Sequence, residues 1–299
     1  MRAKAPIILF TYNRLSETSR TILALQKNIG ALEADLIIFS DAAKQESGKD
    51  SVQKVRNYLR NVSGFKSVKI IERPKNLGLA KSIITGVSEV IEIHGRAIVL
   101  EDDLITSTNF ISYMNSALDF YESNDKIWSI SGYTPPIKYP SEYDFDSAFC
   151  IRGSSWGWAT WADRWKSIDW SISDYGEFSK DRSARINFNR GGSDMCKMLK
   201  DQMSEKINSW AIRFCYSQFR QGKYDVIPKI SKIKNIGFDV DATHTKGMNR
   251  RFTTNLDESN TTIFQFPTIP SINPSILKQF QKYFSVRTRL THKVLRYFS

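Results

Sequence analysis

Short apolar runs and amphipathic segments alternate along the first 131 residues. Continuous apolar runs of this length are typical of strands buried on both faces of a sheet, and apolar residues spaced three or four apart indicate helices. The runs predict strands at 6–11, 36–39, 68–71, 97–100 and 127–130. The helical spacing predicts helices at 16–28, 52–59, 79–91 and 107–121. We therefore expect an α/β fold with a Rossmann-like, mostly parallel sheet flanked by helices.

The regular alternation ends near residue 135. Three prolines fall within 135–140, and five of the seven tryptophans fall within Trp156–Trp170. The stretch 181–194 contains a Gly-Gly pair and has the composition of a loop. We divide the chain into two halves of one domain, 1–135 and 136–258, followed by a tail, 259–299.

The tail is basic. It contains six Lys and Arg and no acidic residue, a charge of +6, which is half of the net +12 that 43 Lys+Arg and 31 Asp+Glu give the whole chain. Apolar residues recur every four positions at 276/280/284 and 290/294/298, which predicts a basic amphipathic helix. A helix of this kind can lie on an anionic lipid surface, and it can equally well be docked on the domain. Nucleic acid is disfavoured as a partner, because no nucleic-acid-binding motif accompanies the charge.

The amino-acid composition disfavours several classes of protein. With 41% hydrophobic and 25% charged residues the chain is typical of globular proteins, not disordered ones. Three cysteines and three histidines without a Cys-x-x-Cys pair disfavour a disulfide framework and a structural zinc site. The sequence has no apolar run of about 20 residues, and the first run is too short for a signal peptide. We expect a reduced, cytoplasmic protein.

Polar residues follow three of the predicted strands. Thr11-Tyr12-Asn13-Arg14 follows the first, Ser40-Asp41 the second and Glu101-Asp102-Asp103 the fourth. Ligands of parallel α/β sheets bind at the carboxyl ends of the strands, so these residues predict a binding site. Three adjacent carboxylates also repel one another. Mg²⁺ or Mn²⁺, held with the help of substrate phosphates, relieves that repulsion, and the alternative is a solvated acidic turn before the next helix.

Together these segments resemble the A-type glycosyltransferases, whose nucleotide-sugar domain is Rossmann-like. The resemblance is closest to the N-acetylglucosaminyltransferase I family, which uses a Glu-Asp-Asp metal motif, and extends to bacterial family-2-like sugar transferases of surface polysaccharide synthesis. It covers roughly residues 5–250 and rests on Pro6–Arg14, Ser40-Asp41, Val99–Leu104 and Trp156–Trp165. It implies that 1–135 binds the nucleotide-sugar and that 136–258 binds the acceptor.

The resemblance implies roles for the matched residues. The nucleotide and the donor sugar would be bound by Thr11, Tyr12, Asn13, Arg14, Asp41, Glu101 and Asp102. Among these, Asp41 would accept a hydrogen bond from uracil N3–H. Asp103 would bind Mn²⁺ or Mg²⁺, a Lewis acid that stabilises the leaving diphosphate.

Four further candidates follow. Lys81 lies near a predicted helix start, where it either adds charge beside a phosphate or is simply solvated. His244 matches a late histidine that many A-type transferases place on the metal, and a surface histidine without a role is the alternative. Trp156 and Trp158 are expected to face the acceptor, because aromatic faces stack on sugar rings, while the other tryptophans pack in the core.

The catalytic base departs from the family pattern. An inverting transferase needs a carboxylate to deprotonate the acceptor hydroxyl, and the family places it just before a tryptophan at a helix start. Here that position reads Asn208-Ser209-Trp210, which contains no acid. Glu205, Asp163 and Asp194 are nearby substitutes, although each fits a solvated helix charge equally well. A retaining reaction needs no such base, and neither does an inactive protein.

The sequence thus predicts a metal-dependent glycosyltransferase. We expect it to move a hexosyl or N-acetylhexosaminyl group from a UDP-sugar to a hydroxyl of a lipid-linked or polysaccharide acceptor, in bacterial surface polysaccharide synthesis. The basic tail suggests peripheral contact with anionic lipid at the inner face of the cytoplasmic membrane. The alternative is a non-catalytic nucleotide-sugar or polyanion-binding protein that retains the fold.

Overall fold

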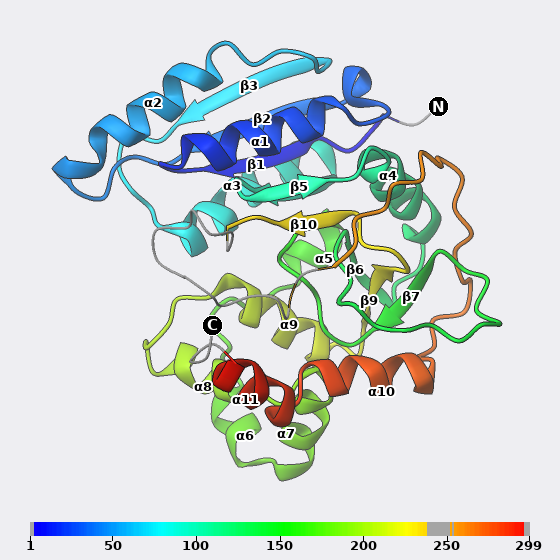
Figure 1. Cartoon of the computed structure of the whole chain (residues 1–299). Helices are drawn as coiled ribbons and strands as arrows, with labels where there is room; N and C mark the ends of the chain where they lie inside the picture. Colours follow the sequence, from blue (N-terminus) through cyan, green and yellow to red (C-terminus); the bar gives the residue numbers. More distant parts are fainter. Residues whose placement is uncertain (1–2, 238–251, 253, 296–299) are drawn as a thin grey trace.

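An eight-stranded sheet forms the centre of the molecule (Figure 1). The computed structural model describes residues 3–237, 252 and 254–295. The strand order is β3-β2-β1-β4-β8-β6-β9-β7, and β5 and β10 form a separate antiparallel pair. The strands are β1 (Ile7–Thr11), β2 (Asp35–Ser40), β3 (Ser67–Glu72), β4 (Arg96–Glu101), β5 (Leu104–Thr106), β6 (Ile127–Ser131), β7 (Ser147–Cys150), β8 (Trp158–Trp161), β9 (Tyr224–Pro228) and β10 (Ile233–Asn235).

Most strands of the large sheet point the same way. β3, β2, β1 and β4 are mutually parallel, and β6 is parallel to β9. β8 lies between β4 and β6 and runs antiparallel to both, and β7 runs antiparallel to β9. Each of the five predicted strands is present with its ends within one residue of the prediction. The predicted α/β class with a mostly parallel sheet is therefore confirmed.

Helices cover both faces of the sheet. Their bounds are α1 (Leu15–Gln26), α2 (Lys49–Leu59), α3 (Leu79–His94), α4 (Phe110–Tyr121), α5 (Ala162–Lys166), α6 (Tyr175–Lys180), α7 (Arg182–Phe188), α8 (Met195–Met203), α9 (Trp210–Arg220), α10 (Pro274–Tyr283) and α11 (Val286–Leu295). The prediction of a loop at 181–194 was wrong, since α7 begins there. The Asp181 side chain caps this helix by accepting from the Ala184 N–H at 2.9 Å, and Phe188 is buried at its end.

The two faces of β1 show how the core is divided. Ile7 and Leu9 point into an apolar cluster with residues of α1, α2 and α4, whereas Ile8 and Phe10 point into a cluster with residues of α3, α5 and α9. Alternate residues of a strand point to opposite faces, so a strand buried on both sides reads as a continuous apolar run. The second cluster contains most of the tryptophans.

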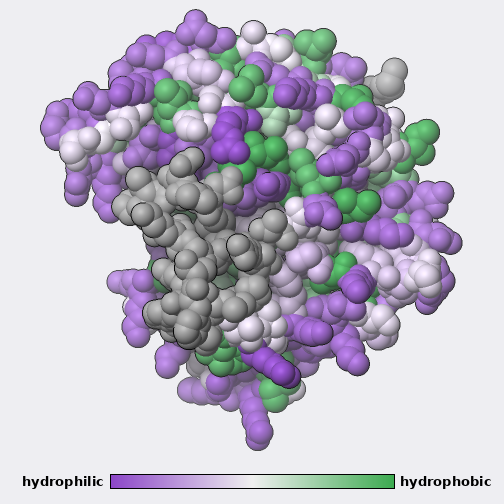
Figure 2. Space-filling view, in the orientation of Figure 1, coloured by the Kyte–Doolittle hydropathy of each residue, from purple (hydrophilic) through white to green (hydrophobic). Residues whose placement is uncertain are grey.

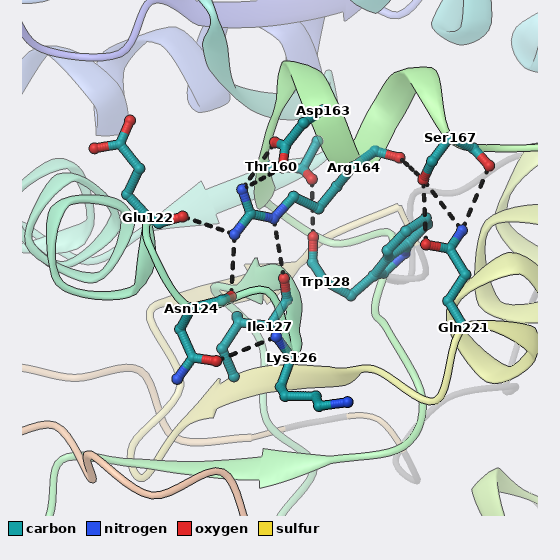
Figure 3. A network of polar contacts seen from close by, with 10 residues as sticks. All are labelled: Glu122, Asn124, Lys126, Ile127, Trp128, Thr160, Asp163, Arg164, Ser167 and Gln221. Atoms are coloured by element: carbon teal, nitrogen blue, oxygen red, sulfur yellow. Dashed lines mark hydrogen bonds and ion pairs between the residues drawn. The ribbon is translucent and has the colours of Figure 1, made fainter.

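A buried arginine joins α5 to the end of α4 (Figure 3). The Arg164 guanidinium donates from Nη2 to the Glu122 and Asn124 carbonyls at 2.7 and 3.0 Å, and from Nε to the Ile127 carbonyl at 3.3 Å. It also pairs with Asp163 at 2.7 Å. The Glu122 carbonyl lies at the C-cap of α4, where no partner exists within the helix, so Arg164 satisfies a group that would otherwise be unpaired.

The predicted tail helix is present as α10, followed by α11. Ile276, Phe280 and Phe284 are buried against β7 and β9, which shows that the four-residue spacing of 276/280/284 marks a docked face. Lys278 and Lys282 lie on the exposed side of α10. On the face of the molecule shown in Figure 2, hydrophilic side chains predominate and hydrophobic ones are scattered. Within the described residues, no helix has the length and hydrophobicity needed to cross a bilayer.

Asp225 on β9 generates a prediction about stability and pH. This carboxyl is fully buried, it accepts from the Ser129 hydroxyl and from the Cys150 thiol, and burial raises its pKa well above the ordinary 3.8. As pH rises above about 4, the unfolded chain releases this proton while the folded chain retains it, so folding becomes less favourable. We expect Asp225→Asn to raise the Tm relative to wild type by an amount that grows from pH 4 to pH 8. Thermal unfolding across this range tests it.

The exposed Asp144 provides the control, because Asp144→Asn changes the same group without changing a buried carboxyl. A Tm difference between wild type and Asp225→Asn that stays constant with pH would contradict the prediction.

Candidate functional site

The polar segments after β1, β2 and β4 meet at one edge of the sheet. In the strand register Thr11 lies opposite Ser40, and Phe10 lies opposite Glu101. The residues that continue these strands are therefore neighbours, as the sequence predicted. Direct side-chain contacts join Arg14 to Asp102 and Asp103 across this edge.

Arg14 bridges two carboxylates of the acidic triplet. Its Nη2 lies 2.5 Å from Asp102 Oδ1 and 3.0 Å from Asp103 Oδ2. Asp102 is 4% exposed and also accepts from the Tyr12 N–H and the Thr18 hydroxyl, each at 3.4 Å. The repulsion within the triplet, which the sequence predicted a metal ion would relieve, is thus relieved in part by a guanidinium at the N-cap of α1, just after the neighbouring strand β1.

The environment of the triplet changes its protonation. Burial, reinforced by the charges of Asp103 and Asp102, raises the pKa of Glu101 to about 8. Burial also raises the pKa of Asp102 to about 6, although Arg14 opposes the rise. Burial alone would lower the pKa of Arg14, but the two carboxylates raise it above its ordinary value.

Asp103 is the carboxylate best placed to bind a cation. Its side chain is 15% exposed, and its backbone carbonyl accepts from the Ile236 N–H at 2.9 Å. Gly237 lies against it so closely that a Cβ there would be 2.3 Å from Asp103 Oδ2. Among the described residues no three His, Cys, Asp or Glu side chains form a metal cage. One carboxylate fits Mg²⁺ or Mn²⁺ only when substrate phosphates supply further ligands. His244, the other predicted metal ligand, lies outside the described residues.

Asp41 fixes the loop that begins α3. Its carboxylate accepts from the backbone N–H groups of Ala42, Leu77 and Gly78 at 3.0–3.1 Å, and from the Ser82 hydroxyl at 3.4 Å. These bonds satisfy N–H groups at the start of α3, where no partner exists within the helix. The contacts thus give Asp41 a positioning role, and its contact with uracil stays a prediction. Lys81 is exposed on the first turn of the same helix.

The corner after β1 is partly anchored. Thr11 is buried and donates to the Phe39 carbonyl at 3.4 Å. The Tyr12 hydroxyl accepts from the Lys44 N–H at 3.1 Å, which ties the corner to the loop after β2. Asn13 is half-buried beside them.

The two candidate acceptor tryptophans have different surroundings. Trp158 is 1% exposed and stacks on Trp210 and Trp165, with ring centroids 4.9 and 5.6 Å away. It packs in the core, contrary to the acceptor-facing position that the sequence suggested. Trp158 lies opposite Val99 in the antiparallel β4–β8 pair, so the chain just before β8 passes the end of β4 that carries the acidic triplet. This direction brings the half-buried Trp156 to the same edge.

Asp163 lies at the wrong edge of the sheet for a catalytic base. It follows Trp161, which pairs with Arg96 at the beginning of β4. β8 is antiparallel, so its carboxyl end lies at the edge opposite the acidic triplet, and the Asp163 carboxylate pairs with Arg164 there. This placement contradicts the sequence-based suggestion.

The remaining candidate bases lie near α8 and α9. Glu205 is exposed in the turn before α9 and has a φ of 58°. Ser209 caps α9 by accepting from the Ile212 N–H at 3.3 Å. Asp194 is paired with Arg152 at 2.9 Å. Glu205 therefore stays a predicted base, and Asp194 has a structural partner.

Sequence reasoning missed two features of the site. It did not single out Gly237, although the absence of a side chain there gives Asp103 its space. It also missed Arg152, which lines a cavity with Trp156. A glycine after a β-strand or an arginine after a buried strand has no distinctive local pattern, because each matters through a contact distant in sequence.

Comparison with known proteins assigns no family. No protein-family model and no curated protein matches the chain. The fold is similar to the mannosyltransferase PcManGT from Pyrobaculum calidifontis in complex with GDP-Man and Mn²⁺, with 10% identity and a TM-score of 0.40 over 73% of this chain and 74% of that one. It is also similar to S. aureus TarS, with 11% identity and a TM-score of 0.41 over 77% of this chain and 36% of TarS. The chain thus spans about a third of TarS. The resemblance to the N-acetylglucosaminyltransferase I family stays a prediction.

The Arg14 bridge predicts a loss of stability on substitution. In Arg14→Gln the buried Asp102 loses its charged partner, and we expect a decrease of about 2 kcal/mol in the free energy of unfolding at pH 7. The control is Arg60→Gln, which removes an exposed pair with Glu72 and should cost less than about 1 kcal/mol. Urea unfolding of both variants measures the difference. An Arg14 variant no less stable than the Arg60 variant would show that the bridge contributes little.

Proposed function

We propose that the protein is a metal-dependent glycosyltransferase that uses a UDP-sugar donor. The observation that carries the proposal is the cluster of Arg14, Asp102 and Asp103, built from the ends of two parallel strands, with Trp156 arriving at the same edge from β8. This edge is where α/β sheets bind ligands. A guanidinium and a carboxylate side by side suit a nucleoside diphosphate held together with a divalent cation.

The charged residues of the site would have different roles in binding the donor. Asp103 would hold Mn²⁺ or Mg²⁺, which as a Lewis acid stabilises the departing diphosphate. Arg14 orients both aspartates and presents a positive charge to a phosphate oxygen. Glu101 would line the ribose and sugar side of the donor. Asp41 holds the α3 loop beside the nucleotide.

Each half of the domain would bind one of the two substrates. Residues 1–135 contribute the acidic triplet and the corner after β1, which bind the donor. Residues 136–258 contribute Trp156, whose ring suits stacking on an acceptor sugar. We propose a lipid-linked or polysaccharide acceptor of bacterial surface polysaccharide synthesis, and Glu205 as the base of an inverting transfer.

The proposal predicts metal-dependent release of UDP. We expect slow hydrolysis of one member of a UDP-sugar panel with Mn²⁺, abolished by EDTA and reduced more than about 100-fold in Asp103→Asn, which loses the charge that holds the cation. Asp163→Asn is the matched control, because that carboxylate lies at the opposite edge of the sheet. Its rate should stay within a factor of two of wild type. Release of UDP measured by a coupled assay provides the rates.

The outcomes separate the candidate functions. UDP that binds with Mn²⁺, without release from any donor, would favour the non-catalytic nucleotide-sugar-binding protein. Failure of UDP to bind wild type in the presence of Mn²⁺ would overturn both candidates.

We further propose that α10 and α11 contact anionic lipid at the inner face of the cytoplasmic membrane. The apolar stripe of α10 is docked on the sheet, so the contact would rest on exposed Lys278, Lys282 and Arg287, beside the exposed Val286 and Leu290 of α11. Each basic residue near such a surface contributes about 1 kcal/mol.

This contact predicts binding that depends on charge. The protein should sediment with phosphatidylglycerol vesicles and not with phosphatidylcholine vesicles, and Lys278→Glu/Lys282→Glu should weaken sedimentation at least about 10-fold. Lys66→Glu/Lys69→Glu, on β3 and the segment before it, provides the matched control. Equal sedimentation of the two double variants would contradict the membrane contact.

A further inference from the structure

A cavity of about 190 Å³ lies between the segment before β8, helices α8 and α9, and the docked face of α10. Its walls are mostly apolar, and its lining residues include Trp156, Met195, Met198, Ala211, Phe280 and Phe284. Trp156 thus belongs both to the cavity lining and to the segment before β8, which runs toward the edge that carries the acidic triplet. The cavity therefore lies beside the proposed acceptor residue Trp156.

Arg152 is a charged residue in the lining of the cavity, and its contacts hold it in place. Its guanidinium forms two bonds to the Asp194 carboxylate at 2.9 and 3.2 Å, and it lies 4.3 Å from the centre of the Phe284 ring. The ion pair connects the segment after β7 to the start of α8, and the ring contact connects it to the end of α10. Three elements distant in sequence thus hold the cavity walls in place.

The charge near this wall is positive. Arg289 on α11 donates to the Ser193 hydroxyl at 3.0 Å, next to Asp194. Arg152 and Arg289 therefore surround one carboxylate, and they leave an excess of one positive charge beside an apolar cavity.

The size and chemistry of the cavity select the ligand. An apolar cavity of about 150 Å³ binds benzene, so this cavity has room for an apolar group of about six carbon atoms. A sugar would leave many hydroxyl groups without partners against these walls, and unpaired buried polar groups are costly. An alkyl or prenyl group fits the walls, and a phosphate attached to it fits the adjacent positive charge.

We propose that this cavity binds the apolar group of a phosphate-bearing, lipid-linked acceptor, next to the sugar-transfer site. The inference rests on the proposed function and deepens it, because it selects an amphiphilic acceptor over a free polysaccharide. It also assigns α10 two roles: one face walls the lipid group, and the other carries the basic residues.

The test uses n-decyl phosphate, below its micelle concentration, as the probe, because its ten-carbon chain can place about six carbon atoms in the cavity. Calorimetric titration of the wild-type chain should give saturable binding, while glycerol 3-phosphate, which has a phosphate and no apolar chain, should bind at least 10-fold more weakly. Met198→Trp fills the cavity and should weaken binding of decyl phosphate at least 10-fold. Met203→Trp, on the same helix but outside the lining, should bind within threefold of wild type.

A second variant and a second readout keep the test decisive. Ala211→Leu reduces the cavity by a smaller change in volume and should also weaken binding, which covers a failure of Met198→Trp to fold. UDP binding with Mn²⁺ is measured on every variant and should not change. If wild type does not bind decyl phosphate, or if both cavity variants bind it as tightly as wild type, the inference is overturned. Retained UDP binding would leave the proposed donor site standing, whereas loss of UDP binding in wild type would overturn that site instead.

Discussion

The ion pair of Arg14 with Asp102 and Asp103 is the interaction on which the site depends. Three adjacent carboxylates at a buried strand end repel one another, and burial penalises each charge further. The fold relieves part of this cost, because Arg14, which follows β1 at the N-cap of α1, bonds two of the carboxylates. The arrangement requires β1 and β4 to be neighbours in the sheet. The site is thus inseparable from the strand order.

The direction of β8 determines what reaches this edge. An antiparallel strand inserted beside β4 brings the residues before it to the carboxyl edge and carries the residues after it to the opposite edge. The segment that carries Trp156 therefore runs toward the acidic triplet, whereas Asp163 pairs with Arg164, which bonds the C-terminal end of α4. Because β8 is antiparallel to β4, Trp156 and Asp163 lie toward opposite edges of the sheet, although they are only seven residues apart in the sequence.

The docked face of α10 links the tail to the same region. Its buried aromatic residues pack on β7 and β9 and also wall the cavity beside Trp156. Burial of those residues stabilises the helix, because isolated helices of this length are marginal in water. The basic residues then lie outward, since the apolar side of an amphipathic helix is the side that packs. The docking of α10 therefore determines both which of its residues pack in the core and which way its basic residues face.

The sequence by itself determined the strands β1 to β4 and β6, the helices between them and the helical tail, because continuous runs and spacings of three and four report burial directly. It also placed Arg14, Asp41 and Glu101–Asp103 at strand ends, and parallel topology then required them to share an edge. Other features depended on contacts distant in sequence: the pairing of Arg14 with the aspartates, the core position of Trp158, the removal of Asp163 from the site and the space that Gly237 leaves for Asp103. The local sequence around a tryptophan or an aspartate is the same whether its strand is parallel or antiparallel to the neighbouring strand. Only pairing between distant strands sets that direction, so only the tertiary structure decided which of these side chains reach the site.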